Sequence, residues 1–226
     1  MIANIPQAFV NAGYFQGFDR PLWYAAVVLM FISSIVFFIR MKKAQVAGAR
    51  QWYFGFALFS VCYGLTRLCF NLGVDFGNVC DTCYDFWTGL GYTVSMPGVI
   101  ALMYAAEKNI ITGTKHVFTC VLVGGLVIGI LGLLGVYSRD TTLILNDIVS
   151  VVATVLIFFI YIVLIRNSTG TLRKKTIGAF SGIIIWFVAI ILDGQAAYSL
   201  IAMPTLLPPI MYITGVILYT IFQRMD

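Results

Sequence analysis

Histidine is almost absent from this sequence: His116 is the single one among 226 residues. A haem site with two histidine ligands is therefore excluded, and a nucleophile activated by a histidine base is disfavoured, because His116 sits at an expected helix end beside Lys115. The chain also lacks a glycine-rich loop followed by Lys and Ser or Thr, which argues against nucleotide-driven pumping. We therefore expect no catalytic residue, no cofactor and no metal, and we do not expect an enzyme.

Charge is scarce as well. Asp, Glu, Lys and Arg make up 10% of the residues and hydrophobic residues 61%, whereas charged residues make up about 25% of an average soluble domain. This composition excludes a soluble core and indicates that the chain lies in a lipid bilayer.

Long apolar runs are what the sequence has instead. Seven of them, each about the length that crosses a bilayer as a helix, cover residues 22–40, 51–73, 86–106, 116–137, 143–165, 176–198 and 201–222. The first run lacks the basic stretch and the cleavage site of a signal peptide, so we expect it to be retained. The sequence predicts an all-α membrane protein, a single seven-transmembrane-helix bundle with short loops.

The basic residues indicate the orientation of this bundle. Short loops rich in Lys and Arg stay in the cytoplasm, and three alternate loops and the tail hold most of them: Arg40, Lys42, Lys43, Arg50, Lys108, Lys115, Arg166, Arg173, Lys174, Lys175 and Arg224. We expect a multi-pass protein of the cell membrane with its N-terminus outside and its C-terminus inside. This asymmetry explains the net charge of +5, so no nucleic-acid partner is expected.

Three ionisable residues fall within the expected spans: Arg67, Asp147 and Asp193. At 1.5 Å per residue they lie about 24, 27 and 25 Å from the cytoplasmic ends of their spans, which is one level near the outer surface. Further side chains that can form hydrogen bonds occur around that level: Tyr63, Thr66, Asn71, Tyr92, Thr93, Asn146, Gln195 and Tyr198. A polar chamber that opens outward is the functional interpretation, and helix ends wetted by the headgroup region are the alternative.

A position at a wetted helix end does not explain Arg67 well, because the apolar run that contains Arg67 continues beyond it to residue 73. An unpaired arginine there would be costly, so we predict that it pairs with Asp147 or Asp193. If one Arg meets two Asp, the cluster keeps one negative charge or holds a proton, which would suit a cationic or protonatable ligand.

Glycines and prolines mark two further spans. Gly125, Gly129 and Gly132 recur on one face of the fourth span, where small residues allow close helix packing, either within the chain or in a homodimer. Prolines should kink or delay helices at two places, at Pro97 in the third span and at Pro204, Pro208 and Pro209 near the start of the seventh.

The cysteines offer one notable spacing, Cys80-Asp81-Thr82-Cys83, on the expected outer side. A loop disulfide between Cys80 and Cys83 is the leading interpretation, and unpaired thiols, metal binding or redox chemistry are the alternatives. No histidine and no second pair of this spacing accompany them, so a tetrahedral zinc site would lack ligands.

Seven spans with an outside N-terminus and short loops resemble the topology of opsins and G-protein-coupled receptors. The resemblance is one of topology, because 201–222 contains no lysine for a retinal Schiff base, and Ala106-Glu107-Lys108-Asn109 does not match the receptors' Asp/Glu-Arg-Tyr. Sugar transporters with three-plus-one-plus-three spans share this topology, although their Pro-Gln loop is absent. The stretch from Glu107 to Lys115 is also similar to uncharacterised archaeal seven-helix membrane proteins, which carry no known activity.

These patterns predict an opsin-like, receptor-like sensor that binds a small ligand or ion. Arg67 and Asp193 would be the central contacts, Asp147 would tune the charge, and Tyr63, Tyr92 and Tyr198 would wall the site, with Asn71, Asn146 and Gln195 nearby. A cytoplasmic partner would carry the output. A transporter or channel that uses the same cluster as a gate or proton relay, and a thiol-active membrane protein built on Cys80 and Cys83, are the alternatives.

Overall fold

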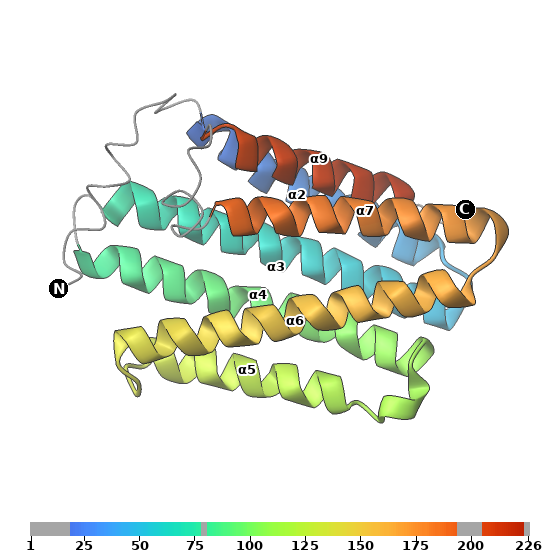
Figure 1. Ribbon diagram of the computed structural model, residues 1–226, viewed down its shortest axis with the longest axis horizontal. Coiled ribbons are helices and arrows are strands. Elements are labelled where there is room, and N and C mark those ends of the chain that lie inside the picture. The colour runs from blue at the N-terminus through green and yellow to red at the C-terminus, as the bar shows by residue number, and fades with distance from the viewer. Residues whose placement is uncertain (1–18, 78–80, 194–204, 224–226) are drawn as a thin grey trace.

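The computed structural model describes residues 19–77, 81–193 and 205–223, and in these ranges the chain is helical throughout apart from short connections (Figure 1). The α-helices of the described residues are α2 (Asp19–Lys43), α3 (Ala47–Gly77), α4 (Asp81–Asn109), α5 (Val117–Leu133), α6 (Arg139–Asn167), α7 (Gly170–Leu192) and α9 (Leu207–Phe222). A single 3-10 turn, Thr112–Thr114, joins α4 to α5. Each of the seven apolar runs therefore overlaps one helix, although α7 begins and ends six residues before the expected run 176–198.

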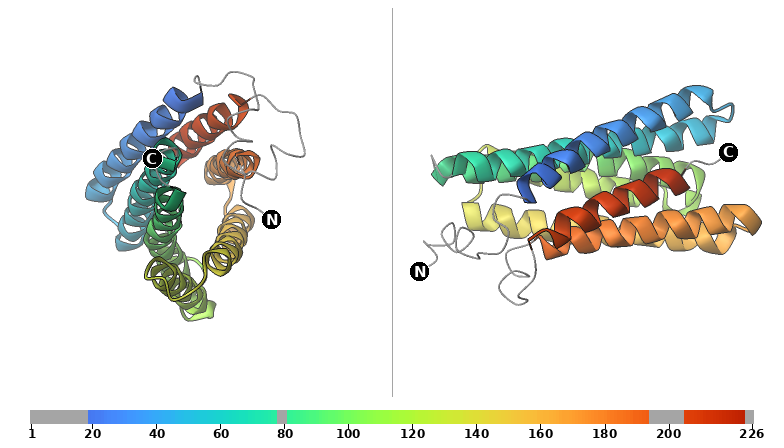
Figure 2. Two further views of the ribbon diagram at one scale, coloured as in Figure 1. Left: turned by 90° about the vertical axis from the view of Figure 1, so that its left-hand side faces the viewer. Right: turned by 90° about the horizontal axis from the view of Figure 1, so that it is seen from above.

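Each helix packs against the next one in the chain, and α2 packs against α9, so the seven helices close into a ring (Figure 2). The most extensive contacts join α3 to α4, α2 to α3, and α7 to α9. The lysines and arginines in the last turns of α2, α4 and α6 gather at one end of the bundle, which we call the basic end. The other end, where α2 begins and α7 finishes, is called the opposite end.

Among the described residues, five helical segments are long and apolar enough to cross a membrane: Asp19–Lys43, Ala47–Gly77, Cys83–Asn109, Ile148–Asn167 and Gly170–Leu192. Apolar side chains are also exposed along one face of α6, where Ile144, Ile148, Val151, Val155 and Phe159 recur at helical spacing. Water would penalise such a face, whereas lipid solvates it. The expectation of an all-helical membrane protein is thus confirmed at this level, while the number of crossings and the orientation stay predictions.

Helices α5 and α9 are shorter than the runs that predicted them. The fourth run was expected to extend to residue 137, but α5 ends at Leu133 because Gly135 adopts a left-handed conformation with φ +74°. The amides of Gly135 and Val136 donate to the carbonyls of Gly132 and Leu131, a Schellman motif that stops a helix.

Proline explains the late start of α9. The seventh run was expected to begin at residue 201, but the helix begins at Leu207, with Pro208 and Pro209 in its first turn. Proline fits there because the first amides of a helix have no intrahelical acceptor. The prediction of a delayed helix is confirmed for these two prolines, whereas Pro204 lies outside the described residues. Helix α4 continues through Pro97 without ending.

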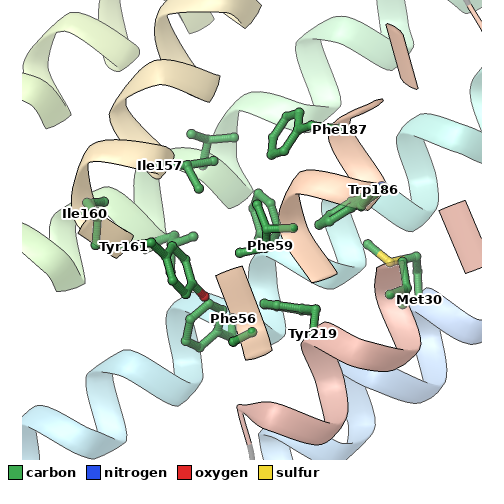
Figure 3. Packing of buried hydrophobic residues seen from close by; sticks show 14 of the residues in the cluster. Met30, Phe56, Phe59, Ile157, Ile160, Tyr161, Trp186, Phe187 and Tyr219 are labelled. Carbon is green, nitrogen blue, oxygen red and sulfur yellow. The ribbon is translucent and has the colours of Figure 1, made fainter. Parts of the chain in front are cut away.

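The core is a cluster of aromatic side chains that α2, α3, α6, α7 and α9 share (Figure 3). The ring of Tyr219 lies 5.4 Å from Phe56, 5.5 Å from Phe37 and 6.1 Å from Trp186. Trp186 in turn contacts Phe59 at 5.3 Å. Edge-on and tilted ring pairs of this kind each contribute about 0.5–1.5 kcal/mol beyond the burial of their area.

Glycine allows α7 and α9 to approach most closely. A Cβ added to Gly182 would lie 2.8 Å from the carbonyl oxygen of Gly215, and a Cβ added to Gly215 would lie 2.6 Å from the amide nitrogen of Trp186. The two backbones are thus in direct contact, as small residues permit in membrane helices. Helices α7 and α9 therefore form one tightly packed pair.

The glycine face of α5 also packs within the chain. Gly125 lies against Val149 of α6, and a Cβ added to Gly129 would lie 2.8 Å from the Oγ1 of Thr93 on α4. Close packing inside the bundle, one of the two expectations for this face, accounts for both glycines. A homodimer through Gly125, Gly129 and Gly132 stays a prediction.

Candidate functional site

An ion pair near the opposite end joins Arg67 of α3 to Asp193, the residue that caps the C-terminus of α7. The side chain of Arg67 is 13% exposed and that of Asp193 is 23% exposed. A carboxylate at the C-terminus of a helix opposes the helix dipole, so the guanidinium compensates a charge that α7 alone would disfavour. The prediction that Arg67 pairs with one of the two aspartates is confirmed, and its partner is Asp193.

Trp23 of α2 forms one wall of this site. The guanidinium carbon of Arg67 lies 3.1 Å from the centre of the indole ring, a position in which the ring attracts the cation. The indole is held in turn by Tyr212 of α9, with ring centres 5.5 Å apart. Four helices therefore meet at the ion pair.

A face of α3 presents Arg67 to the other helices. Phe56, Ser60, Tyr63, Arg67 and Asn71 follow one another at spacings of three and four residues, which places them on one side of the helix. The ring of Tyr63 packs 5.1 Å from Trp186 of α7, so this face is turned towards α7. Tyr63 thus lies beside the ion pair, and Asn71 lies one turn beyond it.

Two nitrogen atoms on this face have unused hydrogen-bonding capacity. The Nε of Arg67 and the Nδ2 of Asn71 are both buried and have no hydrogen-bond partner among the described residues. A buried donor without an acceptor costs about 1–3 kcal/mol. The site can therefore accept a group that supplies lone pairs, such as a carboxylate, a phosphate or ordered water.

Buried polar groups continue from the ion pair towards the basic end. On α9, Tyr212, Tyr219 and Gln223 are buried at spacings of seven and four residues, which spans about 16 Å along the helix. The amide of Gln223 donates to the hydroxyl of Tyr161 on α6, a contact between two buried side chains at the basic end.

Further buried hydroxyl groups lie near Tyr219 and Gln223. The hydroxyls of Ser33 on α2 and Thr220 on α9 form a buried hydrogen bond. The hydroxyls of Ser60 on α3 and Tyr219 on α9 are buried next to each other. The apolar segment 155–164 contains the single polar residue Tyr161, and that residue is the one that meets Gln223.

Tyr92 and Thr66 occupy a different interface. The ring of Tyr92 packs edge-on against Phe70, 5.4 Å away, and the hydroxyl of Thr66 donates to the carbonyls of Cys62 and Gly91. These contacts join α3 to α4. Gln195 and Tyr198 lie outside the described residues, and the side chains of Asn146 and Asp147 lie outside the description as well. The expectation of a cluster with two aspartates therefore keeps one described member, Asp193.

The thiol hypothesis depends on residues that are described only in part. Cys80 lies outside the described residues, so its pairing with Cys83 stays a prediction. Cys62 and Cys69 are buried in α3 as free thiols. In the described ranges, no group of three His, Cys, Asp or Glu side chains is arranged to hold a metal ion.

Glu107, near the end of α4, is an acidic residue that is almost fully buried, with 2% of its surface exposed. Its carboxylate accepts hydrogen bonds from the amides of Phe118 and Thr119 at 3.0 and 2.8 Å. These are free amides of the first turn of α5, so Glu107 caps that helix from the end of α4.

A second ion pair, at the opposite end, joins Arg20 of α2 to Asp75 of α3. The hydroxyl of Tyr24 also donates to Asp75, at 2.6 Å. The side chain of Arg20 is 47% exposed and that of Asp75 is 30% exposed. The expected spans 22–40 and 51–73 leave Arg20 and Asp75 in loops, whereas both residues belong to the ends of helices, α2 and α3.

Comparison of the chain with protein-family models, with curated proteins and with solved structures finds no match. The resemblance to opsins and receptors accordingly stays an expectation from topology.

Proposed function

We propose that this chain is a membrane sensor in which a small ligand acts on the Arg67–Asp193 pair. In this proposal the basic end faces the cytoplasm, as the distribution of lysine and arginine leads us to expect, and the ion pair lies towards the outside. The observation that carries the proposal is the pair itself: a partly buried guanidinium that joins α3 to α7 and rests on an indole of α2. Ionisable side chains within membrane helices are costly and are kept mainly for function.

The unused donors indicate the chemistry of the ligand. Arg67 Nε and Asn71 Nδ2 both lack acceptors, so a carboxylate or phosphate group could bind them and compete with Asp193 for the guanidinium. A cationic ligand was expected on the basis of two aspartates around one arginine. The two donors without an acceptor make an anionic ligand the better proposal.

Transmission would run through the aromatic cluster. Asp193 follows α7 directly, and Trp186 lies two turns earlier on that helix, in contact with Tyr63, Tyr212 and Tyr219. A joint shift of α7 and α9 after loss of the ion pair would therefore move these rings against Phe56 and Phe59 of α3 and strain the Tyr161–Gln223 contact. A cytoplasmic partner at the basic end would sense this change.

A proton relay is a second candidate, favoured by the buried hydroxyl and amide groups along α9. A transporter that uses the same cluster requires a polar path below it, and Tyr212, Tyr219 and Gln223 lie in line towards the basic end. The aromatic packing around these groups is tight, however, because the ring of Tyr219 packs against Phe37, Phe56 and Trp186. This packing favours the sensor.

Ligand binding is tested with the purified chain in nanodiscs. Acetate, phosphate and tetramethylammonium are added in turn, and the melting temperature is measured for the wild type, Arg67→Met and Asp193→Asn. We expect acetate or phosphate to raise the melting temperature of the wild type and to have no effect on Arg67→Met. Stabilisation by tetramethylammonium alone, lost in Asp193→Asn, would reverse the assigned charge of the ligand.

Transmission is tested by amide hydrogen exchange of the same variants. Arg67→Met should increase exchange at the basic ends of α6 and α9, near Tyr161 and Gln223, in addition to its local effect. Arg20→Met, which breaks the other ion pair, should alter exchange locally in α2 and α3 alone. Equal effects of the two variants at the basic end would contradict transmission through the aromatic cluster.

The relay is tested in liposomes that contain a pH-sensitive dye. Proton uptake driven by a potassium diffusion potential is measured for the wild type, Arg67→Met and Tyr219→Phe. The sensor proposal expects no uptake above that of protein-free liposomes. Uptake by the wild type that both variants abolish would replace the sensor with the relay.

A further inference from the structure

A groove with a volume of about 460 Å³ lies on the side of the bundle between α3, α4 and α5, away from the Arg67–Asp193 pair. Its floor is formed by α4, where Pro97, Ala101 and Ala105 recur every fourth residue. Residues at this spacing share one helix face, and their small side chains leave α4 lower than its neighbours. Phe54 of α3 and Val123 of α5 form the two walls.

The groove runs along the helix axes for about two thirds of the depth of one leaflet. On α3 its lining extends from Gln51 to Leu58, and on α4 from Pro97 to Tyr104 and Ala105. Seven residues correspond to about 11 Å, whereas one leaflet of a hydrocarbon core of about 30 Å is about 15 Å deep. A linear apolar chain parallel to the helices would fit such a groove.

The mouth of the groove, at the basic end, is polar and positively charged. The ammonium group of Lys108 lies 5.6 Å from the ring centre of Tyr104, a lining residue. The ring of His116 stacks on the ring of the same Tyr104, with ring centres 5.0 Å apart. The amide of Asn109 donates to Gln51, which also lines the groove, at 3.2 Å.

We propose that this groove binds one acyl chain of an anionic phospholipid, with the phosphate of the headgroup at Lys108. The shape and the charge require the same orientation, because the apolar channel leads into the hydrocarbon and the cation marks its interfacial end. Phosphatidylcholine also carries a phosphate, but its choline cation offsets the attraction to the ammonium group, whereas a basic residue near an anionic membrane surface contributes about a fivefold preference. The groove is therefore selective for negative headgroups.

The test is native mass spectrometry of the detergent-purified chain with phosphatidylglycerol and phosphatidylcholine of identical acyl chains. The wild type should retain phosphatidylglycerol in preference, and Lys108→Gln should lower this preference about fivefold. Ala101→Phe should reduce retention of both lipids because it fills the floor. If that variant does not fold, Val123→Phe, which narrows the groove from an exposed wall position, replaces it.

Two control variants separate the groove from the general properties of the surface. Arg173→Gln removes an exposed charge at the basic end on α7, and Val155→Phe enlarges a side chain on the exposed face of α6. Neither should change lipid retention. The proposal is overturned if Arg173→Gln lowers the preference as much as Lys108→Gln, if the wild type retains both lipids equally, or if the wild type is a dimer that Ala101→Phe dissociates, since a second copy would then cover the groove.

Discussion

The Arg67–Asp193 pair allows the sharpest quantitative prediction, because its burial lies between two well-defined limits. Removing one partner of a fully buried pair costs about 3–5 kcal/mol, whereas an exposed pair is worth about 0–1 kcal/mol. With side chains 13% and 23% exposed, the pair lies nearer to the buried limit. We expect Asp193→Asn to lower the free energy of unfolding by about 2 kcal/mol, within the range for a partly buried charge.

Arg67→Met should cost more than Asp193→Asn, because it also removes the contact with Trp23. A cation over an aromatic ring contributes about 1 kcal/mol when partly desolvated, so the expected loss is about 3 kcal/mol. The double variant contains neither charge and leaves none unpaired. Its loss should be about 3 kcal/mol rather than the sum of the two single losses, which gives a coupling energy of about 2 kcal/mol.

The assay is reversible unfolding in mixed micelles, followed by circular dichroism of the helices. The matched control is Arg20→Met with Asp75→Asn, an ion pair at the same end whose side chains are 47% and 30% exposed. Its coupling energy should stay below about 1 kcal/mol. A coupling energy for Arg67 and Asp193 that is no larger than the control value would refute the argument from burial.

Three further changes are tested by the same unfolding assay. Gly182→Ala should lower the free energy of unfolding by about 1–3 kcal/mol because its Cβ would meet the backbone of α9. Gly124→Ala is the control: its Cβ would meet open space, so it should be neutral or stabilising by up to about 1 kcal/mol. Equal effects of the two variants would contradict the α7–α9 contact. Gly135→Ala should cost about 1 kcal/mol because φ is +74° there. Glu107→Gln should cost about 1–2 kcal/mol through the weakened cap of α5, and an unchanged midpoint would contradict that role.

The positions of the helices could be predicted from the sequence because lipid imposes a simple rule on it. A span must be apolar for about 20 residues, so each of the seven runs overlaps a helix. The same rule indicated that Arg67 needs a partner, and Asp193 is that partner. The helix ends were less predictable, because local backbone geometry decides them: Gly135 stops α5, and Pro208 and Pro209 begin α9.

The surroundings of the ion pair were harder to foresee, because aromatic residues are common throughout the chain. A signal existed in their spacing: Trp186 and Asp193 are seven residues apart on α7, as are Tyr212 and Tyr219 on α9. Seven residues are two helical turns, so each pair lies on one face. This spacing indicates the face but not the helix that it meets. The placement of Trp23 under Arg67 depends on how four helices pack, which no local pattern encodes.

The geometry of α7 and α9 constrains how a change at the ion pair could spread. Because Gly182 and Gly215 bring the two backbones into contact, a shift of α7 relative to α9 would create a gap between backbones that no side chain fills. The two helices should therefore move together. Movement of α7 and α9 relative to α3 would strain the ring contact between Phe56 and Tyr219. Movement of the same two helices relative to α6 would strain the hydrogen bond from Gln223 to Tyr161. The second contact lies at the basic end, so in the proposed sensor the glycine packing of α7 and α9 would carry a change from the ion pair to the basic end together with the aromatic cluster.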